Sequence, residues 1–171
     1  MQHFIERQGL CMKISYIKIQ NYKSIRELEI SDMENALILV GKNNTGKTAV
    51  IDAILLATGN HAPQKMEFLD PDKSLSISLK IDITPEDLTY YHSRQIVSRH
   101  KDYDKWFAEF CSLLPSYQDD TISFTCRINP ELNVRYNDGF QKHNPNIPTI
   151  FPKIYHIDQT RNLDALQNDV F

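Results

Sequence analysis

An eight-residue loop, Gly41 to Thr48, constrains this 171-residue chain more than any other feature. The loop reads GKNNTGKT and fits the pattern GxxxxGK[ST] at every fixed position. An uninterrupted apolar run, Ala36 to Val40, precedes it, as expected for a strand that is buried on both faces of a sheet. The segment from Gly46 to Ala57 is predicted to form a helix that stops at Gly59. A strand, a phosphate loop and a helix in this order predict an α/β fold of the P-loop NTPase class.

The residue types in the loop suit the binding of ATP and Mg²⁺. Gly41 and Gly46 let the backbone curl so that successive N–H groups converge on phosphate oxygens. Lys47 would reach the β- and γ-phosphates and is the predicted catalytic residue, and the Thr48 hydroxyl would coordinate Mg²⁺. A chance match is the alternative, and the strand and helix in register argue against it. The predicted nucleotide-binding residues of the loop are Gly41, Asn43, Asn44, Thr45, Gly46, Lys47, Thr48 and Ala49.

Alternating apolar residues predict several half-exposed strands outside the loop. The apolar positions of Lys13–Gln20 change parity between Tyr16 and Ile17, which indicates a bulge or burial on both faces. Leu28 and Ile30 continue as a second short strand. Residues 75–83 alternate regularly and predict a strand with antiparallel neighbours.

The second half of the chain predicts a helical insert, at about 85–115, followed by more strands. Thr84-Pro85-Glu86-Asp87 is typical of a helix start, and that helix is expected to reach about Ser98. A second helix is expected from Tyr103 to Leu114. The alternation within 121–136 predicts an antiparallel pair in a peripheral β layer, separate from the sheet of Ala36–Val40. A last strand is expected at 153–157.

Composition excludes several classes of protein. A net charge of -3 gives no basic signature of nucleic-acid binding. Cys11, Cys111 and Cys126 form no CxxC pair, so we expect reduced thiols in a cytoplasmic protein. No apolar run approaches the roughly 20 residues of a membrane span. Residues 1–11 lack the pattern of a signal peptide and are expected to be a flexible extension of a domain at 12–171.

Two motifs together resemble a known family. The turn Asn21-Tyr22-Lys23-Ser24 follows the first strand, and Asn43 stands two residues after the first Gly of the phosphate loop. This pairing resembles the ABC-type ATPase heads of the SMC, RecF and OLD proteins. Within this group, the local sequence of the two motifs is most similar to that of the OLD (overcoming lysogenization defect) family of ATP-dependent nucleases. The resemblance is specific over about 12–59 and only architectural from 74 to 171. It implies a mixed core sheet with a peripheral antiparallel β layer.

The resemblance also implies roles for residues outside the loop. Lys23 and Ser24 would lie beside the nucleotide; alternatively, they are a surface lysine and a turn former. Gln159, just after the last strand, would sense the γ-phosphate and Mg²⁺ as a metal ligand, or it is an ordinary helix-entry residue. Asp158 could instead end a Walker B strand, but Gln159 follows it where a catalytic Glu is expected, so we favour the Gln-loop interpretation.

The sequence between the phosphate loop and residue 171 lacks the other motifs that such an ATPase head needs. We find no apolar run ending in Asp-Glu, no signature segment and no Toprim-like cluster of acids. The chain is therefore expected to be the N-terminal part of an ATPase and to turn ATP over poorly alone. Three hypotheses remain: an OLD-like endonuclease acting on DNA as a head-to-head homodimer, an SMC- or RecF-like DNA maintenance ATPase, and a nucleotide sensor completed by a partner.

Overall fold

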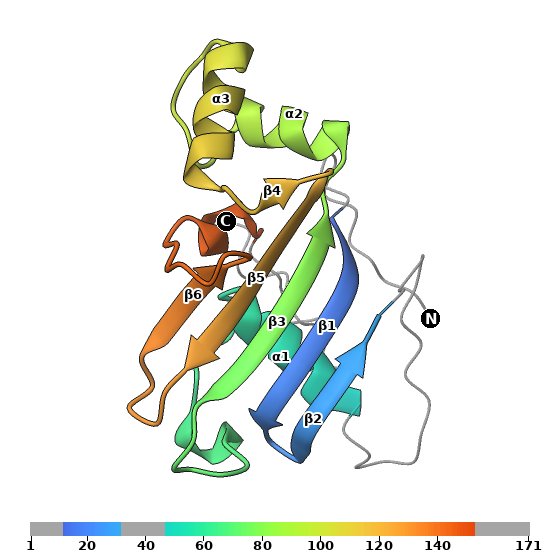
Figure 1. The fold of residues 1–171 in the computed structure, drawn as a ribbon, viewed down its shortest axis with the longest axis vertical. Coiled ribbons are helices and arrows are strands. Elements are labelled where there is room, and N and C mark those ends of the chain that lie inside the picture. The colour runs from blue at the N-terminus through green and yellow to red at the C-terminus, as the bar shows by residue number, and fades with distance from the viewer. Residues whose placement is uncertain (1–11, 32–46, 153–171) are drawn as a thin grey trace, which may run out of the picture.

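The computed structural model describes residues 12–31 and 47–152 (Figure 1). Its strands are β1 (Lys13–Tyr22), β2 (Ile25–Ile30), β3 (Leu75–Asp82), β4 (Tyr117–Gln118), β5 (Thr121–Ile128) and β6 (Val134–Asp138). Its helices are α1 (Lys47–Ala57), α2 (Pro85–Ser93) and α3 (Tyr103–Leu113), with two 3₁₀ turns, η1 (Lys65–Glu67) and η2 (Ile147–Ile150).

The described strands form one antiparallel sheet. Their order is β2-β1-β3-β5-β4, and β6 also pairs with β5. The predicted antiparallel pairing of residues 75–83 and of the pair within 121–136 is thus confirmed. The register of β1 against β3 shifts between Ile14 and Tyr16, so the first of the two alternatives, a bulge, is found just before the predicted change of parity at Tyr16 and Ile17.

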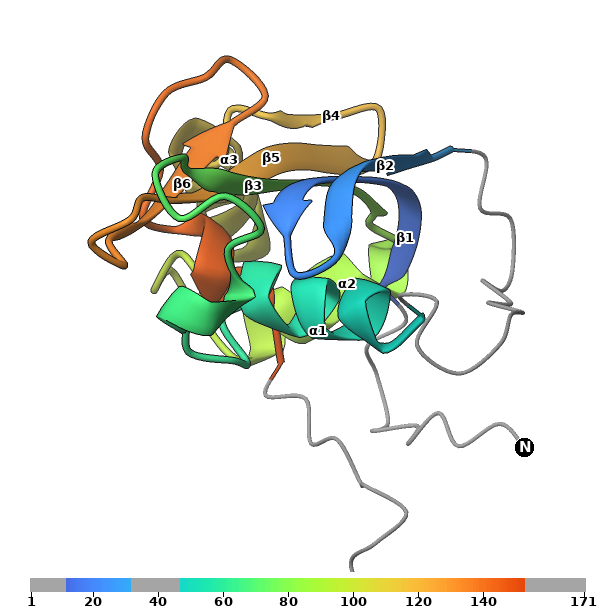
Figure 2. The same cartoon turned by 90° about the horizontal axis from the view of Figure 1, so that it is seen from below.

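One face of this sheet is apolar and buried. Ile17 lies opposite Leu79, and Leu79 lies opposite Phe124, so three strands contribute to one row of side chains. All three residues are at most 2% exposed. The helix α1 covers this face and packs against β1 and β3 (Figure 2). Burial of the alternate residues of each strand is what fixes the pairing register, because a shift by one residue would turn the row outward.

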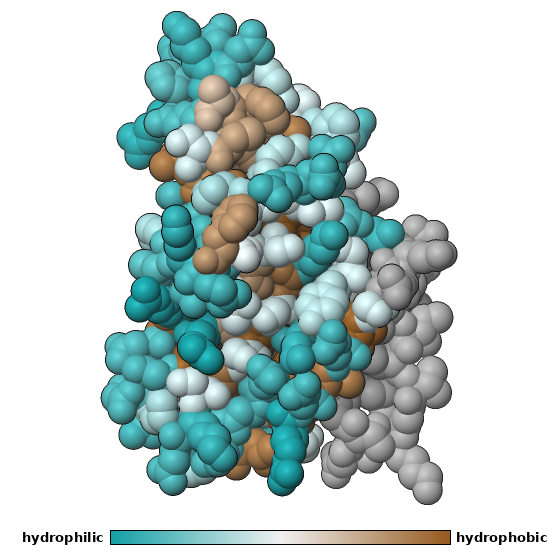
Figure 3. Space-filling model, viewed as in Figure 1, coloured by the Kyte–Doolittle hydropathy of each residue, from teal (hydrophilic) through white to brown (hydrophobic). Residues whose placement is uncertain are grey.

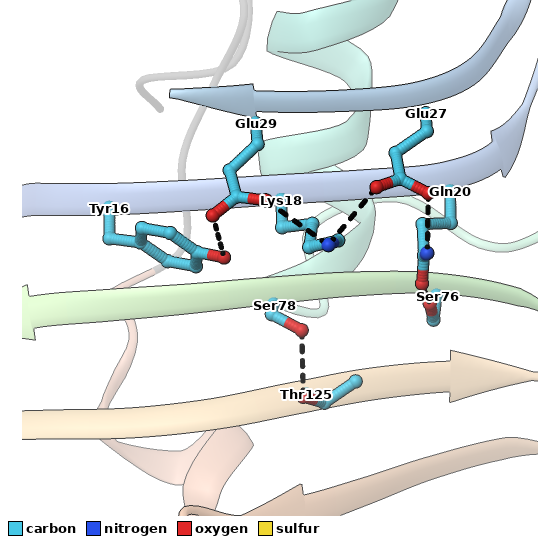
Figure 4. A network of polar contacts seen from close by, with 8 residues as sticks. All are labelled: Tyr16, Lys18, Gln20, Glu27, Glu29, Ser76, Ser78 and Thr125. Atoms are coloured by element: carbon cyan, nitrogen blue, oxygen red, sulfur yellow. Dashed lines mark hydrogen bonds and ion pairs between the residues drawn. The ribbon is translucent and has the colours of Figure 1, made fainter. Parts of the chain in front are cut away.

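The other face is polar and open (Figure 3). Lys18 contacts Glu27 and Glu29, each at 3.1 Å, in the network of Figure 4. The Ser78 and Thr125 hydroxyls meet at 2.8 Å on neighbouring strands. Hydrogen bonds of Glu29 to the Lys18 ammonium and of Glu27 to the Gln20 amide lower the pKa of these two carboxyls.

A helical hairpin occupies the predicted insert between β3 and β5. Thr84 caps α2 and accepts a hydrogen bond from the Asp87 N–H, as the sequence predicts. In α3 the Trp106 and Phe110 rings are fully buried and stack at 5.0 Å. The prediction that the first helix reaches about Ser98 is wrong: α2 ends at Ser93, and the backbone then takes left-handed φ angles at Gln95 and Val97.

Several predicted elements lie outside the described residues. They are the extension at 1–11, the strand Ala36–Val40 and the strand at 153–157. The separation of a peripheral β layer from a core sheet therefore stays a prediction.

Candidate functional site

The N-terminus of α1 has the features of an anion-binding helix end. The first turn begins at Lys47 and carries no acidic side chain. Thr48 is exposed in this turn, whereas Ala49 and Val50 are buried against the sheet. Backbone N–H groups without intrahelical partners and aligned peptide dipoles give such an end a partial positive charge. A phosphate beside Thr48 would therefore be favoured, and no carboxylate of that turn would oppose it.

The other end of α1 stops as the sequence predicts. Gly59 adopts a φ of 75°, a conformation that suits glycine. The Gly59 N–H donates to the Leu56 carbonyl at 3.2 Å and the Asn60 N–H donates to the Leu55 carbonyl at 2.8 Å, which is a Schellman cap. The sequence of α1 is apolar almost all round, which favours a buried helix, yet Ile51 is 43% exposed.

The turn between β1 and β2 is fixed by Asn21. This residue has a φ of 60°, and its side chain holds the segment that follows η1. Its amide donates to the carbonyl oxygens of Asp70 and Lys73, at 3.0 and 2.9 Å, and its own oxygen accepts from the Asp70 N–H at 2.7 Å. Asparagine suits both demands, since it tolerates the left-handed region and carries a donor and an acceptor.

Lys23 links this turn to α1. Its Nζ lies 2.5 Å from Asp52 Oδ2 and 3.8 Å from Glu67 Oε1. Its backbone N–H donates to the Glu67 carbonyl at 2.6 Å, and its ammonium lies 5.4 Å from the centre of the Tyr22 ring. The lysine is thus held by two carboxylates rather than extended into solvent. Ser24 is exposed in the turn.

Glu67 is the buried centre of this junction, with 3% of its surface exposed. It accepts hydrogen bonds from the Tyr22 hydroxyl and the Gln64 N–H, and it contacts His61 Nε2, each at 2.9 Å. Burial, followed by this hydrogen bond to Glu67, raises the pKa of Tyr22 well above its ordinary value. Residues Tyr22, Lys23, Asp52, His61 and Glu67 are called the Lys23 junction below.

The Lys23 junction and the N-terminus of α1 share one face of the helix. Thr48 and Asp52 are four residues apart, so their Cβ atoms lie roughly 5–6 Å from each other on the same side. Figure 2 shows the β1–β2 turn directly over α1. The ammonium of Lys23 is therefore about one helical turn along the helix from Thr48.

Sequence analysis missed the acidic half of this junction. The four-residue spacing from Thr48 to Asp52 was a usable signal, because it places both side chains on one helical face. No comparable signal marks Glu67, which ends a short 3₁₀ turn after the exposed residues Lys65 and Met66. Only the tertiary contact with Tyr22 shows why a carboxylate is buried there.

Other predicted site residues lie outside the described part of the chain. These are Gly41, Asn43, Asn44, Thr45, Gly46, Gln159 and the side chain of Lys47, together with Asp158 of the Walker B alternative. Their roles, and the nucleotide contacts of Lys23, Ser24, Thr48 and Ala49, stay predictions.

The described residues were also compared with the requirements of a metal site, a membrane span and a reactive thiol. Within 12–31 and 47–152, no group of three or more His, Cys, Asp and Glu side chains is arranged to hold a metal ion. Among those same residues, no helix has the length and apolar character to cross a membrane. Cys111 and Cys126 are free thiols, and burial raises the pKa of Cys126 to about 12, so this thiol stays protonated.

Comparison with known proteins identifies the class. Residues 12–168 match the family described as AAA ATPase domain, so the chain belongs to this family. No curated protein matches the sequence.

Solved structures agree at the level of the fold. A structure from work on ATP-driven dimerization and DNA-stimulated activation of SMC ATPases superposes with a TM-score of 0.56 at 14% identity, covering 92% of this chain and 91% of that one. The Smc head domain of Pyrococcus furiosus, with an extended coiled coil and bound to the C-terminal domain of ScpA, gives 0.53 at 14% identity over 82% of this chain. The Smc head of Pyrococcus yayanosii gives 0.51 at 15% identity, also over 82% of this chain.

This chain spans 32% and 25% of the two Pyrococcus chains. The fold is that of an SMC-type, ABC-class ATPase head, as the sequence predicts.

Proposed function

We propose that this chain binds ATP with Mg²⁺ at the N-terminus of α1. The loop residues Gly41 to Gly46 would supply backbone N–H groups to the phosphates, and Lys47 would neutralise their charge. Thr48 would offer its hydroxyl to Mg²⁺, a hard cation that prefers oxygen ligands and that supplies electrostatic stabilisation of phosphoryl transfer. Gln159 is the proposed second protein ligand of the metal.

One observation carries this proposal. The helix that follows the GKNNTGKT loop begins at Lys47, exposes Thr48 and has no acidic residue in its first turn. A carboxylate in that turn would repel a triphosphate, and a buried Thr48 could not reach a metal ion. The residues present therefore fit the group that the motif predicts, within a family of ATPases.

The sequences of the two motifs support a proposal for the role of the full-length protein. We propose the N-terminal ATP-binding portion of an OLD-family ATP-dependent DNA endonuclease, whose heads pair as a homodimer in the cytoplasm. The support is the combination of Asn21-Tyr22-Lys23-Ser24 with the Asn43-containing loop. An SMC- or RecF-like maintenance ATPase without a nuclease is the second candidate, and the likeness to SMC heads favours it.

Calorimetric titration with MgATP tests the binding step. The Lys47→Ala variant should lose at least ~100-fold in affinity, about 2.7 kcal/mol, because its ammonium is proposed to meet the β- and γ-phosphates. Lys42→Ala is the matched control, since Lys42 is not a fixed position of the motif, and it should bind nearly as the wild type does. Wild-type affinity in Lys47→Ala, with circular dichroism unchanged, would show that the loop assignment is wrong.

A cleavage assay separates the two larger roles. The protein encoded by the natural gene is incubated with supercoiled DNA, ATP and Mg²⁺, beside its Lys47→Ala variant. An OLD-like protein nicks or cuts the DNA, and an SMC-like protein leaves it intact while its heads associate with ATP. Intact DNA under all metal and nucleotide conditions would exclude the endonuclease.

A further inference from the structure

The Lys23 junction contains an imbalance of charge. One ammonium, that of Lys23, faces two carboxylates, Asp52 at 2.5 Å and Glu67 at 3.8 Å. His61 is the other basic side chain in contact with Glu67 among the described residues. Two acceptors therefore compete for one lysine, and one of them, Asp52, lies on the side of α1 that also carries Thr48.

Glu67 can release Lys23 without becoming an unpaired buried charge. The Tyr22 hydroxyl, the Gln64 N–H and His61 all remain within 2.9 Å of its carboxylate oxygens. A buried carboxylate that keeps several hydrogen-bond donors is still stabilised when a more distant ion-pair partner, here the Lys23 ammonium, moves away.

Asp52 can also release Lys23. The two side chains are 28% and 35% exposed, so water can replace the lysine at Asp52. Partly exposed ion pairs contribute little to stability and exchange partners readily. The backbone of Lys23 stays fixed meanwhile, because its N–H donates to the Glu67 carbonyl. A change of partner thus needs only a rotation of the lysine side chain.

We propose that Asp52 is a positioning residue that holds the Lys23 ammonium one helical turn from the phosphate site and releases it to phosphate oxygens when a nucleotide binds. The inference rests on the proposed function. A triphosphate carries more negative charge than Asp52 and would lie beside Thr48 on the same helical face, so it draws the lysine away from the carboxylate. Asp52 therefore competes with the nucleotide for Lys23, and the bound nucleotide is sensed by the turn between β1 and β2.

A double-mutant cycle measures this competition. MgATP affinity is determined by calorimetry for the wild type, Asp52→Asn, Lys23→Met and the double variant. Asp52→Asn keeps the shape of the side chain and should tighten MgATP binding by about fivefold or more, because Lys23 no longer has to leave a carboxylate. In the Lys23→Met background the same change should have less than about half of that effect on a logarithmic scale. Asp52→Glu, which keeps the charge, should behave as the wild type.

A second readout follows the lysine itself. In ¹⁵N-labelled protein, the Lys23 ammonium resonance, assigned by its loss in Lys23→Met, should move both on Asp52→Asn substitution and on addition of MgATP. Equal effects of Asp52→Asn in both backgrounds, or an ammonium resonance that MgATP leaves in place, would overturn the inference alone. If none of the four proteins binds MgATP while all keep the wild-type circular dichroism spectrum, the proposed function is overturned together with it.

Discussion

The apolar face of the sheet and the Lys23 junction lie on the same side of the molecule but are built differently. On the apolar face, Ile17, Leu79 and Phe124 come from three strands and need only be large, apolar and in register. In the junction, Lys23 and Glu67 come from segments 44 residues apart, and each contact needs a particular polar atom. Burial of apolar area is non-directional, whereas a hydrogen-bonded junction depends on individual residues. The first region therefore supplies most of the stability, and the second is the better candidate for function.

The largest expected effect is in the apolar face. Phe124 is 2% exposed and contacts the Tyr136 and Phe151 rings. Phe124→Ala should lower the free energy of unfolding by about 3–5 kcal/mol, through lost burial and the cavity it leaves. Urea denaturation measures this, with Met66→Ala, at an 81% exposed position, as a control expected within about 0.5 kcal/mol of wild type. A loss under about 1 kcal/mol would mean that this face is not the stabilising core.

The junction should show a smaller loss. Glu67→Gln replaces one of the two carboxylate oxygens with an N–H₂ group that cannot accept a hydrogen bond. Either the Gln64 N–H, or the Tyr22 hydroxyl together with His61, then loses its acceptor. We expect a cost of about 1–3 kcal/mol in unfolding free energy, the range for a buried group left with an unmatched partner. Glu131→Gln, at an exposed position, is the matched control and should cost almost nothing. Equal costs in both variants would show that Glu67 is not held as described.

Alkaline pH should weaken the apolar side through Cys126. Burial raises the pKa of this thiol from 9.0 to about 12, so above pH 9 the unfolded chain loses a proton that the folded chain keeps. The contribution of Cys126 to the free energy of unfolding is therefore fully present below pH 9. It falls as the pH rises, by at most about 1.4 kcal/mol per pH unit for this one proton. Urea denaturation at pH 8 and 10.5 should give a smaller decrease for Cys126→Ala than for the wild type. An identical decrease would remove Cys126 from this explanation.

The open face of the sheet offers a polar network that should matter least. Lys18→Met should let the pKa values of Glu27 and Glu29 rise toward their ordinary range, because their shared ammonium is gone, while the melting temperature stays within error. Carboxyl ¹³C titrations measure this, with Lys80→Met on the same face as a control that leaves both pKa values in place. A clear fall in melting temperature for Lys18→Met would mean that the open face, too, stabilises the fold.

The contrast between local patterns and specific tertiary contacts also decides which features could be predicted from the sequence. The strands β3 and β5 were predicted because an alternation of period two survives in a half-buried strand whatever its partners are. Thr84 and Gly59 were recognised because capping is a local property. The early end of α2 and the exposure of Ile51 were not, because both depend on what packs nearby rather than on the helix's own residues.

The candidate site divides in the same way. Thr48 follows from a contiguous motif, and its exposure at the start of α1 agrees with the role predicted for it. Glu67 follows only from tertiary contacts, since nothing in the sequence brings residue 67 to residue 23, whereas the spacing of Asp52 from Thr48 was a usable local signal. Asn21 belongs to the turn motif that resembles the family, yet its amide donates to the carbonyl oxygens of Asp70 and Lys73, which is a structural role.

The central claim, that nucleotide binds at the start of α1 beside the Lys23 junction, is tested most directly by a ¹H–¹⁵N correlation titration with MgATP. The largest shifts should fall on the backbone amides of Thr48 and Ala49, with smaller ones at Lys23, and the amides of Ser78 and Thr125 on the open face should not move. Shifts centred on Ser78 and Thr125, or a spectrum unchanged at millimolar MgATP, would contradict the account.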